Sequence, residues 1–419
     1  MEWIKLAFRN VLRNKRRSFI TICAIGVGFA SIGLYHGYIH YNYRGLRLIA
    51  ICGEGLGHLR INKAGWQAKG KLEPEKYMFS KEETEKIMKL VEEEKEVRLT
   101  TPQIQVTGVV TNGAVSTIFI AEGIVPKDEK TIKEIWNASI QHSSNSYIGV
   151  KGQPLSDEKL YGVLMAKDLA GYLNLRPDNE GIVMAQTLNG RMNVMDIQIN
   201  GIYNTGNDIS NDKFMKFNFY FAQALLDTQS TERIVVVLKD WKDTERMRKV
   251  FLKKIRDAGI DCEIRTWNEL SLSYSKMKSY LDTIFMFLSS IVLMIAVIGT
   301  INTMGMTIME RTKEIGTLRA LGFKFRGISV LFALEGAFLG FFGSILGIIL
   351  HTCVWTVIRV YPLYYTPPGL SGPVAMTVDM VPQALLVLMV CFIILSTVAA
   401  IVPARGAAKK NIVDALGHV

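Results

Sequence analysis

The chain has 419 residues, of which 49% are hydrophobic and 21% charged, with a mean hydropathy of +0.19 and a formal net charge of +11. A mean hydropathy this high in so charged a chain indicates long apolar segments separated by ordinary polar sequence. Residues 1–17, 309–326 and 403–419 carry net charges of +5, +3 and +2. Because these basic stretches flank apolar segments, the positive charge indicates membrane topology rather than nucleic acid binding.

Four apolar segments are long enough to cross a membrane. They cover residues 18–38, 284–308, 327–350 and 381–402. Each holds roughly 20 residues or more, which crosses about 30 Å of hydrocarbon at 1.5 Å per residue. Short basic flanks remain cytoplasmic, so both termini and residues 309–326 are expected inside, in a multi-pass protein of the inner membrane.

These segments predict the following order of parts. The N-terminal part is a cytoplasmic amphipathic helix (1–17), a first span (18–41), an extracytoplasmic domain (42–280) and a second span (281–308). The C-terminal part is a cytoplasmic coupling helix (309–326), a third span (327–350), an extracytoplasmic loop (351–380), a fourth span (381–402) and a cytoplasmic tail (403–419). The first helix is predicted because apolar residues recur at helical spacing on one face and basic residues on the other. The apolar residues are Trp3, Ile4, Ala7, Phe8, Val11 and Leu12.

The large extracytoplasmic segment has the pattern of a mixed α/β domain. Strand-like runs lie at 57–62, 103–110, 181–184, 196–203 and 233–238, and helical stretches at 81–94, 167–173 and 241–258. This alternation favours a mixed sheet over an all-β sandwich. The predicted fold class is therefore four transmembrane helices with a large α/β extracytoplasmic domain. Cys52 and Cys262 both fall in this domain, but their spacing does not indicate whether they form a disulfide.

The third span carries four glycines on one helix face. They are Gly336, Gly340, Gly343 and Gly347. This spacing indicates close helix packing, either with a second subunit or inside the same four-helix unit. Glu335 adjoins the glycines, and an ionisable side chain at membrane depth requires a partner. We expect a structural hydrogen bond there rather than a proton relay.

Nucleotide-binding and catalytic motifs are absent from the sequence. It contains no GxxxxGK[ST], GxSxG or HExxH motif and no His/Cys cluster at metal-ligand spacing. We therefore expect no enzyme activity, no metal and no cofactor on this chain, and energy from another protein.

The second span and the segment after it carry a specific motif. Ile301-Asn302-Thr303-Met304 leads into a stretch from Met309 to Gly322 that reads MERTKEIGTLRALG. This resembles the FtsX-like permease family, which includes MacB and the lipoprotein-releasing permeases LolC and LolE. The opening LAFRNVLRNKRRS, Glu335-Gly336 and the VPAR run near the C-terminus agree with the same family.

The resemblance implies a dimer of permeases, either identical copies or paralogues, docked on a separate cytoplasmic ABC ATPase dimer that binds ATP and Mg. The residues implied in this ATPase coupling are Glu310, Arg311, Lys313, Glu314, Ile315, Leu318 and Arg319. A short basic helix with apolar residues on one face suits a groove in such a partner.

The family resemblance leaves three functions open. Four spans and a large outer domain favour extraction of lipoproteins from the outer leaflet of the inner membrane by mechanotransmission. The alternatives are a MacB-like efflux pump, with or without an outer-membrane duct, and a mechanical signal relay that controls a periplasmic enzyme. For an amphiphilic cargo, apolar and aromatic side chains at the outer ends of the first two spans are the expected contacts. They are Tyr35, Tyr38, Ile284 and Phe287. The alternative for these residues is that they face membrane lipid or the neighbouring permease.

Overall fold

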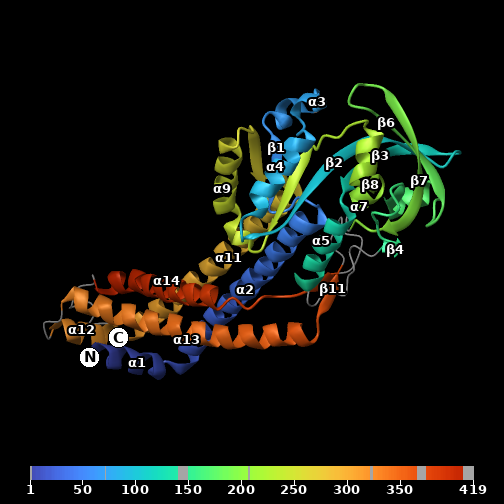
Figure 1. The fold of residues 1–419 in the computed structure, drawn as a ribbon. Coiled ribbons are helices and arrows are strands. Elements are labelled where there is room, and N and C mark those ends of the chain that lie inside the picture. The colour runs from blue at the N-terminus through green and yellow to red at the C-terminus, as the bar shows by residue number, and fades with distance from the viewer. Residues whose placement is uncertain are drawn as a thin grey trace. The chain divides into compact units, whose positions relative to one another are not determined.

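The computed structural model describes residues 2–70, 72–139, 150–205, 208–320, 324–365 and 374–408. The chain divides into two compact units (Figure 1). The helical unit comprises Met1–Tyr43, Lys278–Leu363 and Met376–Val419, and the α/β unit comprises Arg44–Met277 and Tyr364–Ala375.

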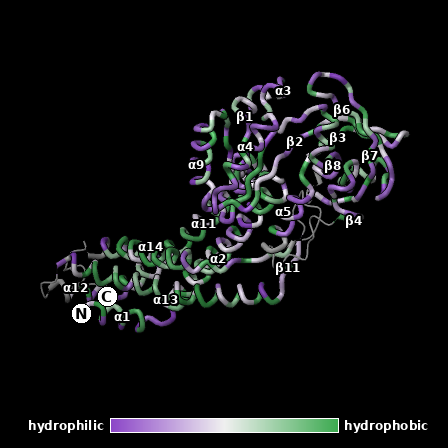
Figure 2. The backbone as a smooth tube through the Cα atoms, viewed as in Figure 1, coloured by the Kyte–Doolittle hydropathy of each residue, from purple (hydrophilic) through white to green (hydrophobic). Residues whose placement is uncertain are grey.

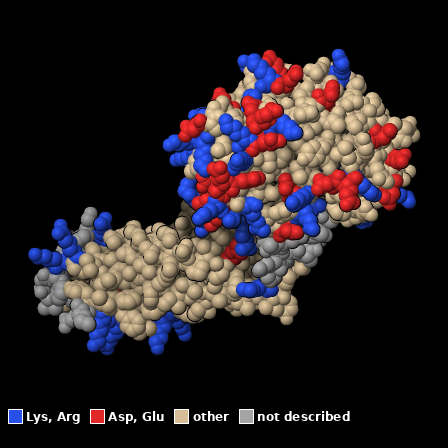
Figure 3. All heavy atoms as spheres, viewed as in Figure 1, with Lys and Arg blue, Asp and Glu red and all other residues tan. Residues whose placement is uncertain are grey.

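The helical unit is built from long apolar helices. In chain order they are α1 (Glu2–Arg13), α2 (Lys15–Leu48), α11 (Leu272–Glu310), α12 (Thr312–Ala320), α13 (Phe325–Val360) and α14 (Pro382–Ala408). Among the described residues, four of these helices are long and apolar enough to cross a membrane, namely α2, α11, α13 and α14. Hydrophobic colour runs along them in Figure 2, and the face drawn in Figure 3 shows a band of this unit without charged side chains.

The basic segments of the helical unit lie together. In Figure 1, α1, α12 and the last residues of α14 are at one end of the unit. Lys and Arg side chains gather at this end on the face drawn in Figure 3. The basic segments of the sequence thus lie at one end of the helical unit.

Two helices extend beyond the spans expected from hydropathy. Helix α13 continues to Val360, so the expected loop at 351–380 is helical over its first ten residues. Trp355 on this extension donates from Nε1 to the carbonyl oxygen of Val378 at 2.9 Å, which ties the extension to the following connection. Helix α14 continues to Ala408 with Pro403 inside it. The strand pair β11 (Leu363–Tyr365) and β12 (Val374–Met376) lies between α13 and α14.

The α/β unit contains a mixed sheet that closes on itself. Its strands are β1 (Leu59–Lys63), β2 (Val97–Thr111), β3 (Ser116–Ile124), β4 (Val150–Gly152), β5 (Gly162–Ala166), β6 (Glu180–Gln186), β7 (Met192–Tyr203), β8 (Phe214–Asn218), β9 (Arg233–Leu238) and β10 (Cys262–Thr266). The described strands pair in the order β10-β1-β9-β2-β3-β8-β5-β7-β4, and β6 joins β7 back to β2. Strands β2, β3, β8, β5, β7 and β6 therefore form a ring with both parallel and antiparallel pairs.

The long strand β2 serves two cores. Its C-terminal half borders the core inside the ring, where Val106, Phe119 and Phe217 are fully or almost fully buried. Its N-terminal half pairs with β9 in a second, antiparallel sheet of β10, β1, β9 and β2. Helices α4 (Lys81–Glu92) and α9 (Thr244–Asp257) contribute to the core of this second sheet.

The remaining short helices connect the strands. They are α3 (Pro74–Tyr77), α5 (Pro126–Ser139), α6 (Lys167–Tyr172), α7 (Asp208–Asn211), α8 (Phe219–Leu225) and α10 (Trp267–Leu270), with π-helical turns at Ile49–Gly53 and Trp66–Gly70 and a 3₁₀ turn at Trp241–Asp243. The mixed α/β fold class expected for this segment is confirmed.

The cysteines are free thiols. Cys52 and Cys262 are buried in different apolar clusters and form no disulfide. Within the described ranges, no group of three or more His, Cys, Asp or Glu side chains is placed to hold a metal ion.

Candidate functional site

The segment implied in ATPase coupling is the short helix α12, which begins two residues after α11 ends. Three of the residues assigned to coupling are exposed, namely Glu310, Lys313 and Glu314. Two are buried, namely Arg311 and Ile315. The side chains of the other two, Leu318 and Arg319, lie outside the part that the structure describes. The segment therefore has an anchored side and a free side.

Arg311 is the centre of the anchored side and is only 8% exposed. Its Nη1 donates to Glu335 Oε1 at 2.9 Å, and its Nε donates to Glu314 Oε2 at 2.8 Å. Its guanidinium carbon also lies 5.6 Å from the centre of the Phe332 ring. The planar guanidinium can serve two carboxylates at once because its donors form a rigid fork. Arg311 thus holds the start of α12 to α13 rather than facing a partner.

Glu335 is 2% exposed in the middle of this cluster. One of its carboxylate oxygens accepts from Asn10 Nδ2 at 2.6 Å and from Arg311 Nη1 at 2.9 Å. Taking a carboxylate out of water costs several kcal/mol unless opposite charge and hydrogen bonds offset the loss. The cluster supplies both, and it joins three separate helical segments, α1, α12 and α13.

Two ion pairs surround the buried cluster. Arg13 Nη2 donates to Glu314 Oε1 at 2.7 Å, and Arg17 Nη1 lies 2.6 Å from Glu310 Oε1. Partial burial acts to raise the pKa of Glu314, but the hydrogen bonds and charges of Arg311 and Arg13 outweigh it and lower the pKa. Because these side chains are about half exposed, each pair contributes only about 0–1 kcal/mol.

Ile315 supplies the apolar part of the anchor. It belongs to the same buried cluster as Val11 on α1, Ile308 on α11 and Phe332 on α13. Burial of such a side chain contributes about 1.5–3 kcal/mol. Helix α12 is thus fixed by Ile315 and Glu314 and by Arg311, the residue just before it. Its exposed side chains Lys313 and Thr317 remain available for contact with another protein.

Asn10 was not anticipated from the sequence. It follows Trp3 and Ala7 at spacings of four and three residues, so it falls on the apolar face of α1. An amide on an otherwise apolar helix face was the available signal that this face meets a polar group.

The four glycines of α13 are in contact within the chain. Gly336 and Gly340 lie against α14, and Gly343 and Gly347 lie against α2. A Cβ atom on Gly336 would come within 2.6 Å of the carbonyl oxygen of Ser396, which is closer than real contacts allow. Of the two alternatives for these glycines, the structure shows packing inside the helical unit.

The residues expected to meet cargo are only partly brought together. The Tyr35 ring stacks on Tyr38 at 6.1 Å and on Phe285 of α11 at 6.0 Å between ring centres. Ile284 is half-buried, whereas Phe287 is 64% exposed. The aromatic groups thus join α2 to α11, and Phe287 is the member with the most free surface.

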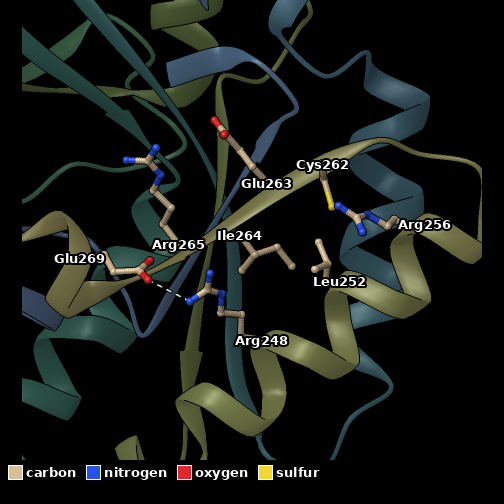
Figure 4. A pocket seen from close by; sticks show the side chains of 8 residues that line it. All are labelled: Arg248, Leu252, Arg256, Cys262, Glu263, Ile264, Arg265 and Glu269. Atoms are coloured by element: carbon tan, nitrogen blue, oxygen red, sulfur yellow. Dashed lines mark hydrogen bonds and ion pairs between the residues drawn. The ribbon is translucent and has the colours of Figure 1, made fainter. Parts of the chain in front are cut away.

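The α/β unit has a pocket of about 510 Å³ between α9 and β10, drawn in Figure 4. Its lining residues are Arg248, Leu252, Arg256, Cys262, Glu263, Ile264, Arg265 and Glu269. Arg248 Nη1 donates to Glu269 Oε1 at 2.9 Å across the pocket (Figure 4). Burial raises the pKa of Cys262 to about 11, so its thiol is not an activated nucleophile at neutral pH. We assign no activity to this pocket.

The helical unit thus has four helices long and apolar enough to cross a membrane, with the short helix α12 between α11 and α13 in the chain. Residues 286–412 match the family model of the FtsX-like permease C-terminal domain. This part of the chain is therefore similar to the FtsX-like permease C-terminal domain.

The similar proteins include ABC transporter permeases. Permease YtrF of Bacillus subtilis is 35% identical over 136 residues, which cover 31% of this chain and 31% of that protein. The lipoprotein-releasing system transmembrane protein LolC of Neisseria meningitidis serogroup B is 26% identical over 163 residues, covering 37% of this chain and 39% of that protein. The matched part of the chain thus spans about a third of the length of these relatives.

A solved structure also matches the chain. It is the periplasmic region of MacB from Actinobacillus actinomycetemcomitans, with a TM-score of 0.36 and 13% sequence identity, covering 52% of this chain and 92% of that structure.

Proposed function

We propose that this chain is the permease subunit of an ABC transporter in the inner membrane, with both termini in the cytoplasm. It couples ATP hydrolysis by a separate cytoplasmic ATPase dimer, which binds ATP and Mg, to movement of its extracytoplasmic α/β unit. The chain itself is a transporter subunit and not an enzyme.

The anchoring of α12 is the observation that carries this proposal. A force applied to α12 by a partner reaches α1 and α13 because the buried side chains of Asn10, Arg311 and Glu335 join the three segments through direct hydrogen bonds. The exposed Lys313 and Thr317 lie on the same short helix and are the surface on which the partner acts. A short amphipathic helix seated in a groove is a common mode of recognition between proteins.

We propose further that the cargo is a lipoprotein taken from the outer leaflet. Glu335 is the charged residue inside the four apolar segments 18–38, 284–308, 327–350 and 381–402, and it is paired within the chain, so a hydrated path for a large polar cargo has no free charged lining. The exposed ring of Phe287 instead offers an apolar surface to an acyl chain. Each buried methylene of such a chain contributes about 0.8 kcal/mol.

Coupling to an ATPase is tested by reversing the charge of Lys313. The tagged chain should copurify from native membranes with an ABC ATPase, identified by mass spectrometry, and should hydrolyse no ATP when purified alone. Lys313→Glu should abolish ATPase capture while leaving the yield of the chain unchanged, because Lys313 is exposed. Lys5→Glu, the same charge change on the exposed side of α1, is the control and should retain the ATPase. Hydrolysis by the isolated chain would refute the proposal.

The cargo is tested with a photocrosslinking amino acid at Phe287 in intact cells. We expect lipoproteins among the captured species because this side chain is exposed on an apolar helix. The same crosslinker at Val402, which is exposed on α14, is the control and should capture lipid without lipoprotein. Equal capture at both positions, or capture of soluble proteins only, would contradict a lipoprotein cargo.

A further inference from the structure

Strand β10 lies at one edge of the second sheet of the α/β unit. Among the described strands it pairs with β1 alone, so its other side has no neighbouring strand. An uncovered sheet edge presents a row of backbone donors and acceptors and is a template for pairing with another chain. The pocket between α9 and β10 lies along this strand (Figure 4). We call this pocket together with the uncovered side of β10 the edge groove.

The hydrogen bonds around β10 identify which residues face the edge groove. Asp261 O accepts from Ala64 N–H at 3.2 Å just before the strand begins. Trp267 N–H donates to His58 O at 3.2 Å just after it ends. Residues 261 and 267 therefore turn their backbone toward β1. Because successive residues of an antiparallel strand alternate in this respect, residues 262, 264 and 266 turn theirs toward the edge groove.

Most of the backbone groups that face the edge groove are unbonded. Thr266 N–H faces away from β1, as the alternation requires, and donates to Glu269 Oε2 at 3.1 Å. The N–H and C=O groups of Cys262 and Ile264 face the same way and bond to none of the described residues. Glu269 thus covers the end of the strand, and the backbone before it is available to an extended peptide.

Helix α9 forms the wall of the edge groove and runs alongside β10. Arg248, Leu252 and Arg256 follow one another at intervals of four residues, so they form a row along one face of the helix. Arg248 reaches Glu269 beyond the end of β10. Arg256 points toward Cys262 at the start of the strand (Figure 4). Helix and strand therefore run side by side in opposite directions.

The spacing of this row matches an added strand. Four helical residues advance about 6 Å along the helix, and two strand residues advance about 6.8 Å along the strand. Alternate side chains of a peptide beside β10 would therefore meet successive members of the row. In strand addition the backbone bonds supply affinity, and such alternate positions supply specificity.

The edge groove carries positive charge that the described chain does not neutralise. Arg248 is engaged by Glu269 at 2.9 Å. Arg256 and Arg265 have no carboxylate partner among the described residues. Glu263, the other acidic residue of the lining, accepts a hydrogen bond from a backbone N–H. Because guanidinium groups form their strongest hydrogen bonds with carboxylates, the groove suits an acidic occupant.

From these observations we propose that an extended, acidic segment of a partner protein adds as a strand to the free side of β10. Its backbone bonds to Cys262 and Ile264. On the α9 side, an apolar side chain packs on Leu252 next to a carboxylate bound by Arg256. On the opposite face of the strand, a second carboxylate binds Arg265. The inference goes beyond the proposed function and requires neither the ATPase nor a lipoprotein.

Peptide binding to the full chain in detergent tests the edge groove. The probe is a fluorescent peptide with the core Glu-Thr-Val-Glu between threonines. In strand alternation its first glutamate lies opposite Arg256, its valine opposite Leu252 and its last glutamate opposite Arg265. We expect saturable binding, measured by fluorescence anisotropy. A peptide with both glutamates replaced by lysine should not bind, and neither should one N-methylated at each core residue, because it cannot donate to the strand edge.

Charge reversal in the chain locates the site. Arg256→Glu and Arg265→Glu should each weaken peptide binding about tenfold or more, because repulsion replaces a charge-assisted hydrogen bond. Arg191→Glu, the same change at an exposed arginine between β6 and β7, is the matched control and should bind the peptide as the wild type does. None of the three side chains is buried, so thermal unfolding in the same detergent should match the wild type for all three variants.

A photocrosslinking amino acid at Leu252 identifies the occupant directly. It should capture the acidic peptide, because Leu252 lines the edge groove. Four outcomes would overturn the proposal. They are absence of saturable binding, equal binding of the lysine or the N-methylated peptide, equal weakening by Arg191→Glu, and capture of a second copy of the chain in place of the peptide.

Discussion

Replacing Arg311 by Gln is expected to destabilise the helical unit by about 3–5 kcal/mol. The substitution leaves the Glu335 carboxylate, which is 2% exposed, with Asn10 as its remaining hydrogen-bond donor and no opposite charge within the buried cluster. The cost arises from an uncompensated buried charge rather than from the loss of one contact. Thermal unfolding of the purified chain in one detergent, followed by loss of helical circular dichroism, measures the effect.

A substitution of Glu335 distinguishes the cost of an uncompensated buried charge from a simple loss of packing. Glu335→Gln removes the buried charge while keeping a group that can accept from Asn10 and Arg311. The double variant Arg311→Gln/Glu335→Gln should therefore be more stable than Arg311→Gln alone. Arg13→Gln, which removes a half-exposed ion pair to Glu314, should cost no more than about 1 kcal/mol. A double variant as unstable as the single one would refute the charge argument.

Loss of Arg311 should also uncouple the transporter before it unfolds. With α12 released from α13, the ATPase can still bind Lys313 but its movement no longer reaches the rest of the helical unit. We therefore expect Arg311→Gln to retain captured ATPase at low temperature while losing transport. Lys313→Glu should instead lose both ATPase binding and transport, because it removes the docking surface itself.

The helical unit was largely predictable from the sequence, and its polar cluster was not. Long apolar segments and basic flanks identify the spans because their signal is local. The need of Glu335 for a partner was also visible, since a carboxylate at that depth is costly. Its partner Asn10, however, lies 325 residues away in the sequence, and no local pattern joins the two. Arg311 resembled the other basic residues of its segment, so its burial was not visible either.

The α/β unit shows the same division between local and long-range information. Strand β9 was predicted with its observed bounds because five apolar residues, four of them β-branched, follow Arg233 there. The strands β3, β5 and β8 were missed, although they contribute half of the closed ring. Their short apolar runs suit a helix or a strand equally well, and pairing across the ring decides between them. Closure depends on β6 joining β2 to β7, which local periodicity does not encode.

Substitution of Gly336 by Ala is expected to destabilise the helical unit by about 1–3 kcal/mol, although alanine is the better helix former. The new Cβ would lie 2.5 Å from Ala400 Cβ and 2.6 Å from the carbonyl oxygen of Ser396. Neither atom can yield without movement of the α14 backbone, so the helices must separate. Gly299→Ala on α11 is the matched control, since its Cβ would meet no atom within 4 Å. That variant should be stabilised by up to about 1 kcal/mol through helix propensity alone. Thermal unfolding in the same detergent should thus shift in opposite directions for the two variants. If both shifted upwards, close contact between α13 and α14 at Gly336 would be wrong.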